Sequence, residues 1–131
     1  MSESNVTYVT SFKFKAVADK YLVNIQFPKP NSPKGIEPIP MFLGSLGGCF
    51  AVYLERWLEN NKLAFKGFNI KVKSELANQT PAYLKVIDVE IKISGLKIDK
   101  AGKAELLRFV SNCPLDVTLH KKPTVNIKLT V

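Results

Sequence analysis

The sequence predicts an α+β fold, and two patterns along its 131 residues carry this prediction. Apolar and polar residues alternate strictly in two pairs of segments, residues 8–27 and 68–94, as in half-buried strands. Apolar residues at spacings of three and four follow each pair, as in helices with one buried face. Because each pair of strands forms a hairpin before a helix, we expect antiparallel pairing and not a doubly wound parallel sheet.

The first hairpin is predicted from residues 8–16 and 21–27, with a turn between them. In the second segment Tyr21, Val23, Ile25 and Phe27 share one side of the strand. Residues 28–40 are rich in Pro and Gly, so we expect a loop there.

A long helix is predicted from Met41 to about Asn60. Three glycines in its first part each cost about 1 kcal/mol relative to alanine, which indicates close packing against another backbone. Its apolar side chains extend well around the circumference, so we expect part of the helix to lie at a dimer interface. The periodic positions are Leu43, Leu46, Phe50, Tyr53, Leu54 and Trp57.

The second hairpin, residues 68–76 and 83–94, is predicted to bury one face of its second strand. That face consists of Ile87, Val89, Ile91 and Ile93.

A second helix is predicted over residues 100–112, with Asp99 as its N-cap. Its inward residues are expected to include Leu106, Leu107 and Val110, together with Ile98 just before the cap. Pro114 ends this helix because it restricts the preceding residue to extended conformations. A short helical turn over residues 114–120 and a closing strand over 124–131 complete the expected order.

Composition predicts one domain spanning residues 1–131. The net charge is +8, and the lysines alternate with apolar residues along the predicted strands, which indicates solvated sheet faces and no nucleic-acid partner. This charge is also compatible with an anionic small ligand. No apolar run approaches the roughly 18 residues of a membrane span, so no membrane partner is expected. The polar, acidic start indicates a cytoplasmic protein with reduced thiols.

The candidate chemistry centres on the two cysteines. There is one histidine, His120, and Cys49 and Cys113 are 64 positions apart, so no metal site is expected. Two cysteines in such a chain are commonly inert core residues. The alternative is reactivity: Cys49 is predicted near the start of a helix, where amides and the dipole stabilise a thiolate, and glycines leave room for a ligand. Cys113 lies at a helix end fixed by Pro114.

Two segments that contain the cysteines carry a resemblance to a known family. "PIPMFLGSLGGCFAVYL", residues 38–54, resembles the first cysteine motif of the OsmC/Ohr family, the osmotically inducible and organic hydroperoxide resistance proteins. "FVSNCPLDVTLHKKPTVNIKL", residues 109–129, resembles the second. The resemblance implies antiparallel sheets with a long central helix, assembled as an intertwined homodimer.

The resemblance also implies a function, thiol-dependent reduction of organic hydroperoxides. Cys49 would attack the peroxide and Cys113 would close a disulfide with it. No cofactor would be bound, and an external dithiol, lipoyl-type or a small thiol, would supply electrons. The alternative is a non-catalytic binding protein of the same fold for an acyl chain or for an anionic small molecule.

The surroundings of the two cysteines depart from the peroxidase motif. Ile39 and Pro40 occupy the positions of the family's glutamate, and the nearest acid is Glu37. The family's arginine in the N-terminal hairpin is also absent, so Lys15 and Lys20 are the candidates for charge support.

Further expectations concern neighbours of Cys49 on the long helix. Arg56 is expected to be an exposed partner of Glu55 or Glu59. An apolar substrate pocket is predicted along the helix, although core packing explains the same spacing. The predicted pocket residues are Phe42, Leu46, Phe50 and Tyr53.

Overall fold

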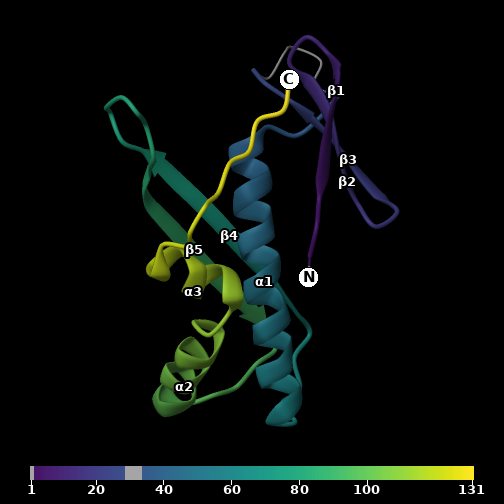
Figure 1. Cartoon of the computed structure of the whole chain (residues 1–131). Coiled ribbons are helices and arrows are strands. Elements are labelled where there is room, and N and C mark those ends of the chain that lie inside the picture. Colours follow the sequence, from purple (N-terminus) through teal and green to yellow (C-terminus); the bar gives the residue numbers. More distant parts are fainter. Residues whose placement is uncertain (1, 29–33) are drawn as a thin grey trace. The chain divides into compact units, whose positions relative to one another are not determined.

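A computed structural model describes residues 2–28 and 34–131 (Figure 1). The chain divides into two compact units, Met1–Gly44 and Ser45–Val131. The order of elements is three strands, a long helix, two strands and two short helices. The structure is therefore the predicted α+β fold with antiparallel sheets and one long helix, while the prediction of a single domain over residues 1–131 stays a prediction.

The first unit contains a three-stranded antiparallel sheet and not the predicted two-stranded hairpin. Its strands are β1 (Asn5–Thr10), β2 (Lys13–Ala18) and β3 (Tyr21–Gln26), in the order β1-β2-β3. Residues 8–16 were expected to form one strand, but the chain turns at Ser11 and Phe12, where Phe12 has a φ of 56°. Because the alternation continues across this tight turn, the pattern alone does not reveal it.

The loop after β3 returns to the sheet edge. Ile36 forms an isolated parallel bridge with Ile25, and its amide donates to the carbonyl of Asn24 at 2.9 Å. A Cβ atom on Gly35 would lie 2.8 Å from that same carbonyl oxygen, so only glycine fits this approach. The predicted loop over residues 28–40 lies in part outside the described residues, and its last three residues are helical.

The long helix α1 (Pro38–Asn60) begins three residues before the expected start at Met41. By length and composition it could cross a membrane, a test that core helices of soluble proteins also pass. In the second unit its inner face packs into the hydrophobic core, where Leu54 and Leu58 are fully buried. The core residues of α1 are Leu46, Phe50, Leu54, Trp57 and Leu58.

The hairpin of β4 (Gly67–Leu76) and β5 (Leu84–Ser94) covers this inner face of α1 (Figure 1). Gly47 allows the close approach, since a Cβ atom there would lie 3.1 Å from a methyl group of Val72. Gly44 and Gly48 have open space around them within the chain. On β5, Ile87, Ile91 and Ile93 pack against the core as predicted, whereas Val89 on the same face is exposed.

The helix α2 (Lys100–Val110) begins as predicted, with the Asp99 carboxylate accepting from the amide of Gly102 at 2.7 Å. Leu106 and Val110 are buried, but the expected inward position of Leu107 is wrong, since it is 60% exposed. Helix α3 (Pro114–Lys121) follows directly and includes the predicted helical turn.

The predicted closing strand does not form within the chain. Residues 122–131 have no regular structure, and their alternating apolar side chains are exposed. The pattern is that of a strand, but a strand needs a neighbour for its backbone hydrogen bonds, and no strand of the described chain pairs with this segment. The unpaired apolar residues are Val125, Ile127, Leu129 and Val131.

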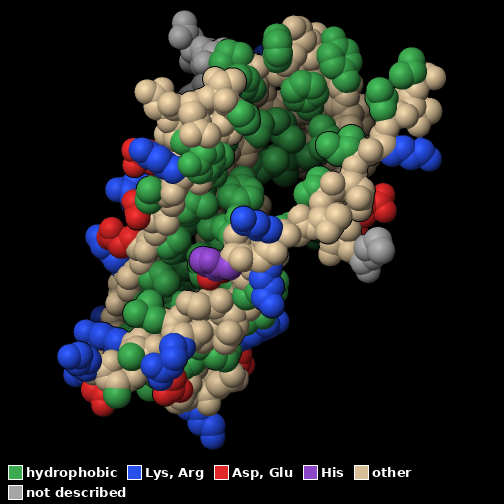
Figure 2. Space-filling model, turned by 60° about the vertical axis from the view of Figure 1, so that its left-hand side comes forward, with side chains coloured by type: hydrophobic (Ala, Val, Ile, Leu, Met, Phe, Trp, Pro, Cys, Tyr) green, Lys and Arg blue, Asp and Glu red, His purple; other side chains and the backbone are tan. Residues whose placement is uncertain are grey.

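Charged side chains are arranged as solvated faces. Across the β4–β5 hairpin Lys71 lies opposite Glu90 and Lys73 opposite Asp88, and Lys85 pairs with Glu75 at 3.0 Å. On the face shown in Figure 2 the basic side chains are scattered among acidic and uncharged ones. This distribution fits the expectation that the lysines lie on the solvent-exposed faces of the strands.

Candidate active site

The structure brings the two cysteines together in the second unit. Cys49 lies on α1 and is partly buried, whereas Cys113 lies between α2 and α3 and is fully buried in the core cluster. Both are free thiols, and their side chains lie close enough for Cys49 to raise the pKa of Cys113. This proximity is what a Cys49–Cys113 disulfide requires.

The expectation that Cys49 lies near the start of its helix is wrong. Because α1 begins at Pro38, Cys49 is about three turns inside it, beyond the first turn with its free amides. The predicted position of Cys49, beside the free amides of a helix start, therefore does not occur. Pro38 and Pro40 led to the prediction of a loop there, although proline is tolerated in the first turn of a helix.

Cys113 occupies a helix start instead. It is the N-cap of α3, and Pro114 follows at the first helical position, where proline lacks only an amide that would be unpaired anyway. Its sulfur makes no well-aligned capping hydrogen bond, but the nearby amides of Leu115 and Asp116 act to lower its pKa. Burial acts more strongly and raises the pKa of the Cys113 thiol, and the neighbouring Cys49 thiol acts in the same direction. The neutral thiol is therefore the favoured form of Cys113.

Aromatic rings flank the thiols one helical turn away. Tyr53 follows Cys49 by four residues on α1, and Phe109 precedes Cys113 by four residues. The two rings therefore meet one helical turn from the point where the two cysteines meet. The ring centroids of Tyr53 and Phe109 are 5.8 Å apart. The Arg56 guanidinium lies 5.2 Å from the Tyr53 ring centroid.

The expected pairing of Arg56 with Glu55 or Glu59 is wrong. Among the ion pairs of the described residues, neither carboxylate pairs with Arg56. The side chain folds back along α1 over Tyr53 instead, where the cation–π contact stabilises it.

The predicted pocket residues differ in their surroundings. Leu46 and Phe50 belong to the core cluster, which explains their apolar character without a ligand. Tyr53 is partly buried between Phe109 and Arg56. Phe42 lies in the first unit and is 43% exposed. A substrate pocket formed by these four residues stays a prediction.

The candidates for charge support, Lys15, Lys20 and Glu37, all belong to the first unit. Their role beside the cysteines also stays a prediction. In the part of the chain that the structure describes, no group of three or more His, Cys, Asp or Glu side chains could hold a metal ion. His120 lies 3.4 Å from the Asp116 carboxylate on the surface of α3.

Two features of the site were missed from the sequence. Phe109 had only a weak signal, its position four residues before Cys113. The stacking of Arg56 on Tyr53 had none, since spacing along a helix fits an ion pair equally well.

The comparisons with known proteins decide the family. The model of the OsmC-like protein family matches residues 30–128. The chain belongs to the OsmC-like family. This confirms the resemblance that the two cysteine motifs carried. No curated protein matches the sequence.

Solved structures share the OsmC-like fold at low sequence identity. An OsmC-like protein from Mycoplasma pneumoniae is 18% identical, with a TM-score of 0.82 over 93% of this chain and 89% of that one. An organic hydroperoxide resistance protein from Elizabethkingia anophelis is 12% identical, with a TM-score of 0.72 over 93% and 89%. An organic hydroperoxide resistance protein OsmC from Legionella pneumophila is 11% identical, with a TM-score of 0.63 over 92% and 90%. At these identities the likeness concerns the fold.

Proposed function

We propose that this OsmC-like protein reduces organic hydroperoxides with a Cys49 thiolate and a Cys49–Cys113 disulfide. The observation that supports it is the contact between two free thiols of unequal exposure, one partly exposed and one fully buried. Family membership is consistent with the proposal, since structural neighbours include organic hydroperoxide resistance proteins.

The oxidation would take two steps. The Cys49 thiolate attacks the terminal oxygen of ROOH, the O–O bond breaks, and the alkoxide leaves and takes up a proton as the alcohol, with Cys49 now a sulfenic acid. The Cys113 sulfur then attacks the Cys49 sulfur. The S–S bond forms, and the sulfenic hydroxyl leaves as water with the proton of Cys113.

Reduction would restore both thiols. One sulfur of an external dithiol, lipoyl-type or a small thiol, attacks the Cys49 sulfur and forms a mixed disulfide while Cys113 leaves. The second sulfur of the dithiol then attacks, releasing Cys49 and the oxidised dithiol. Attack at Cys49 follows from its exposure, and the nearby amides of Leu115 and Asp116 favour the departing Cys113 thiolate.

A homodimer in the cytoplasm is part of the proposal. Large apolar side chains are exposed on all three strands of the first unit and on the unpaired segment at residues 125–131, more than a monomeric protein ordinarily leaves exposed. A second copy would supply neighbours for them. Sedimentation velocity would return twice the mass of the chain for a dimer, and the mass of one chain would contradict this part of the proposal.

The test compares the two cysteine variants. Reduced wild-type protein is mixed with one equivalent of cumene hydroperoxide, and free thiols and the mass of the intact chain are followed. We expect the loss of both thiols in the wild type, no reaction in Cys49→Ser, and a sulfenic acid trapped by dimedone in Cys113→Ser. Thiols that survive as long as those of free cysteine would show that the proposed function is wrong.

A further inference from the structure

The second unit also contains a cavity that neither cysteine lines. This cavity of about 950 Å³ opens between the end of β5, the loop that follows it and α2. The residues that line it are mostly aliphatic. Ile91, Ile93, Leu96 and Ile98 also pack against the core. The aliphatic residues the argument uses are Ile91, Ile93, Leu96, Ile98 and Leu107.

The cavity explains the exposed position of Leu107. The sequence pattern places this residue inward on α2, yet it is 60% exposed, because it faces the cavity and no protein atoms fill that space. Neighbouring Leu106 also lines the cavity but is buried in the core. The apolar surface on α2 therefore extends beyond what the core of the chain covers.

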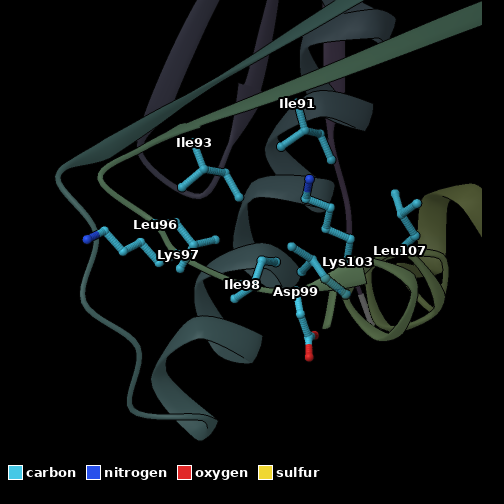
Figure 3. Close-up of a pocket in the computed structure, with 9 residues that line it drawn as sticks. Ile91, Ile93, Leu96, Lys97, Ile98, Asp99, Lys103 and Leu107 are labelled. Atoms are coloured by element: carbon cyan, nitrogen blue, oxygen red, sulfur yellow. The ribbon is translucent and has the colours of Figure 1, made fainter. Parts of the chain in front are cut away.

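One charged group is directed into this apolar space. Figure 3 shows Lys103 extending from α2 toward Ile91, whereas the side chains of Lys97 and Asp99 point away from the cavity. The Asp99 carboxylate is occupied at the amide of Gly102, 2.7 Å away. Among the described residues no acidic side chain forms an ion pair with Lys103.

A single cation beside aliphatic walls matches one kind of small molecule. Ligand pockets of about 300–1,000 Å³ are lined mainly by apolar side chains, with a few polar groups that fix the orientation of the ligand. Here the walls would cover an alkyl chain, and the Lys103 ammonium would pair with an anionic head group at one end of it.

We propose that this cavity binds a single-chain amphiphile with an anionic head group, oriented by Lys103. The chemistry is shared by fatty acids and by single-chain phosphates, and the test distinguishes them. The site needs neither thiol, so it goes beyond the proposed peroxide chemistry and stands without it.

The experiment is isothermal titration calorimetry of the full chain below the critical micelle concentration of each probe. The probes are dodecanoate, dodecyl phosphate and uncharged dodecanol. The test variant is Lys103→Met, which keeps the apolar stem and removes the charge. The matched control is Lys100→Met, an exposed lysine on the same helix that does not line the cavity. Circular dichroism checks that both variants fold.

We expect an anionic probe to bind the wild type. Lys103→Met should lower the affinity for this probe about tenfold, because a hydrogen bond to a charged group contributes about that factor to binding. Lys100→Met should change the affinity by less than about twofold, and neither variant should alter dodecanol binding. Tighter binding of dodecanoate would assign a fatty acid, and tighter binding of dodecyl phosphate a single-chain phosphate. Absence of binding, or equal losses in the two lysine variants, would overturn the proposal.

A second copy of the chain is the other possible occupant. Leu107→Glu places a carboxylate at the cavity, so it should abolish binding of the anionic probes while leaving the sedimentation coefficient unchanged. If this variant instead lowers the mass of the assembly, the cavity is a contact between copies and the proposal is wrong.

Discussion

The fully buried thiol of Cys113 lies beside the partly exposed thiol of Cys49, although the two residues are 64 positions apart in the chain. The contact forms because α1 and the end of α2 pack in one core, where Tyr53 and Phe109 meet one turn away. Their unequal exposure assigns different chemistry to the two sulfurs. Cys49 can meet a molecule from solution, and Cys113 can reach only Cys49.

Alkylation should distinguish the two thiols. With limiting iodoacetamide on the reduced protein, we expect Cys49 to be modified at least about tenfold faster than Cys113, because a fully buried thiol reacts only after local opening. Peptide mapping by mass spectrometry reads the order of modification. In urea the two rates should converge, and equal rates in the native protein would contradict the burial of Cys113.

The stability of the protein should fall in alkaline solution. Since burial raises the pKa of Cys113, the folded chain keeps this proton at pH values where the unfolded chain releases it. Below about pH 8.5, the usual pKa of cysteine, the neutral thiol makes its full contribution to the free energy of unfolding. This contribution is lost as the pH rises through the raised pKa of the folded state. For one titrating group, the free energy of unfolding falls by at most about 1.4 kcal/mol per pH unit.

Urea unfolding at a series of pH values measures this effect, with reductant present throughout. The control is Cys113→Ala, whose unfolding free energy should decline less steeply above about pH 8.5. Identical slopes for the variant and the wild type would mean that Cys113 ionises alike in the folded and unfolded chains.

Adjacent leucines on α2 offer a matched test of the core. Leu106 is 6% exposed and Leu107 is 60% exposed. Leu106→Ala should lower the free energy of unfolding by about 2–5 kcal/mol, because it leaves a cavity in the core. Leu107→Ala should change it by about 0.5 kcal/mol or less. Chemical denaturation compares the two, and similar losses would place Leu107 in a packed environment that the single chain lacks.

Periodicity predicted most of the second unit because each of its elements buries one face against the others. Leu46, Phe50, Leu54 and Trp57 recur at helical spacing and form the core, and the Asp99 cap is a local contact that a sequence reveals. Leu107 shows where periodicity fails to predict burial. It fits the apolar stripe of α2, but the stripe is wider than the surface that faces it.

Features that depend on distant neighbours were not predictable in the same way. The alternation at residues 124–131 predicts a strand, yet a strand exists only where another strand accepts its hydrogen bonds. Cys49 was expected near a helix start because the pattern began at Met41, three residues late. The family resemblance predicted that Cys49 and Cys113 act together. The spacing of residues along the chain does not predict this.

The most direct test of the central proposal is the mass of the intact wild-type chain after one equivalent of organic hydroperoxide, followed by peptide mapping without reductant. We expect a loss of two hydrogens and a cross-linked peptide pair that contains Cys49 and Cys113. An unchanged mass, or oxygen added to Cys49 with the Cys113 thiol still free, would contradict it.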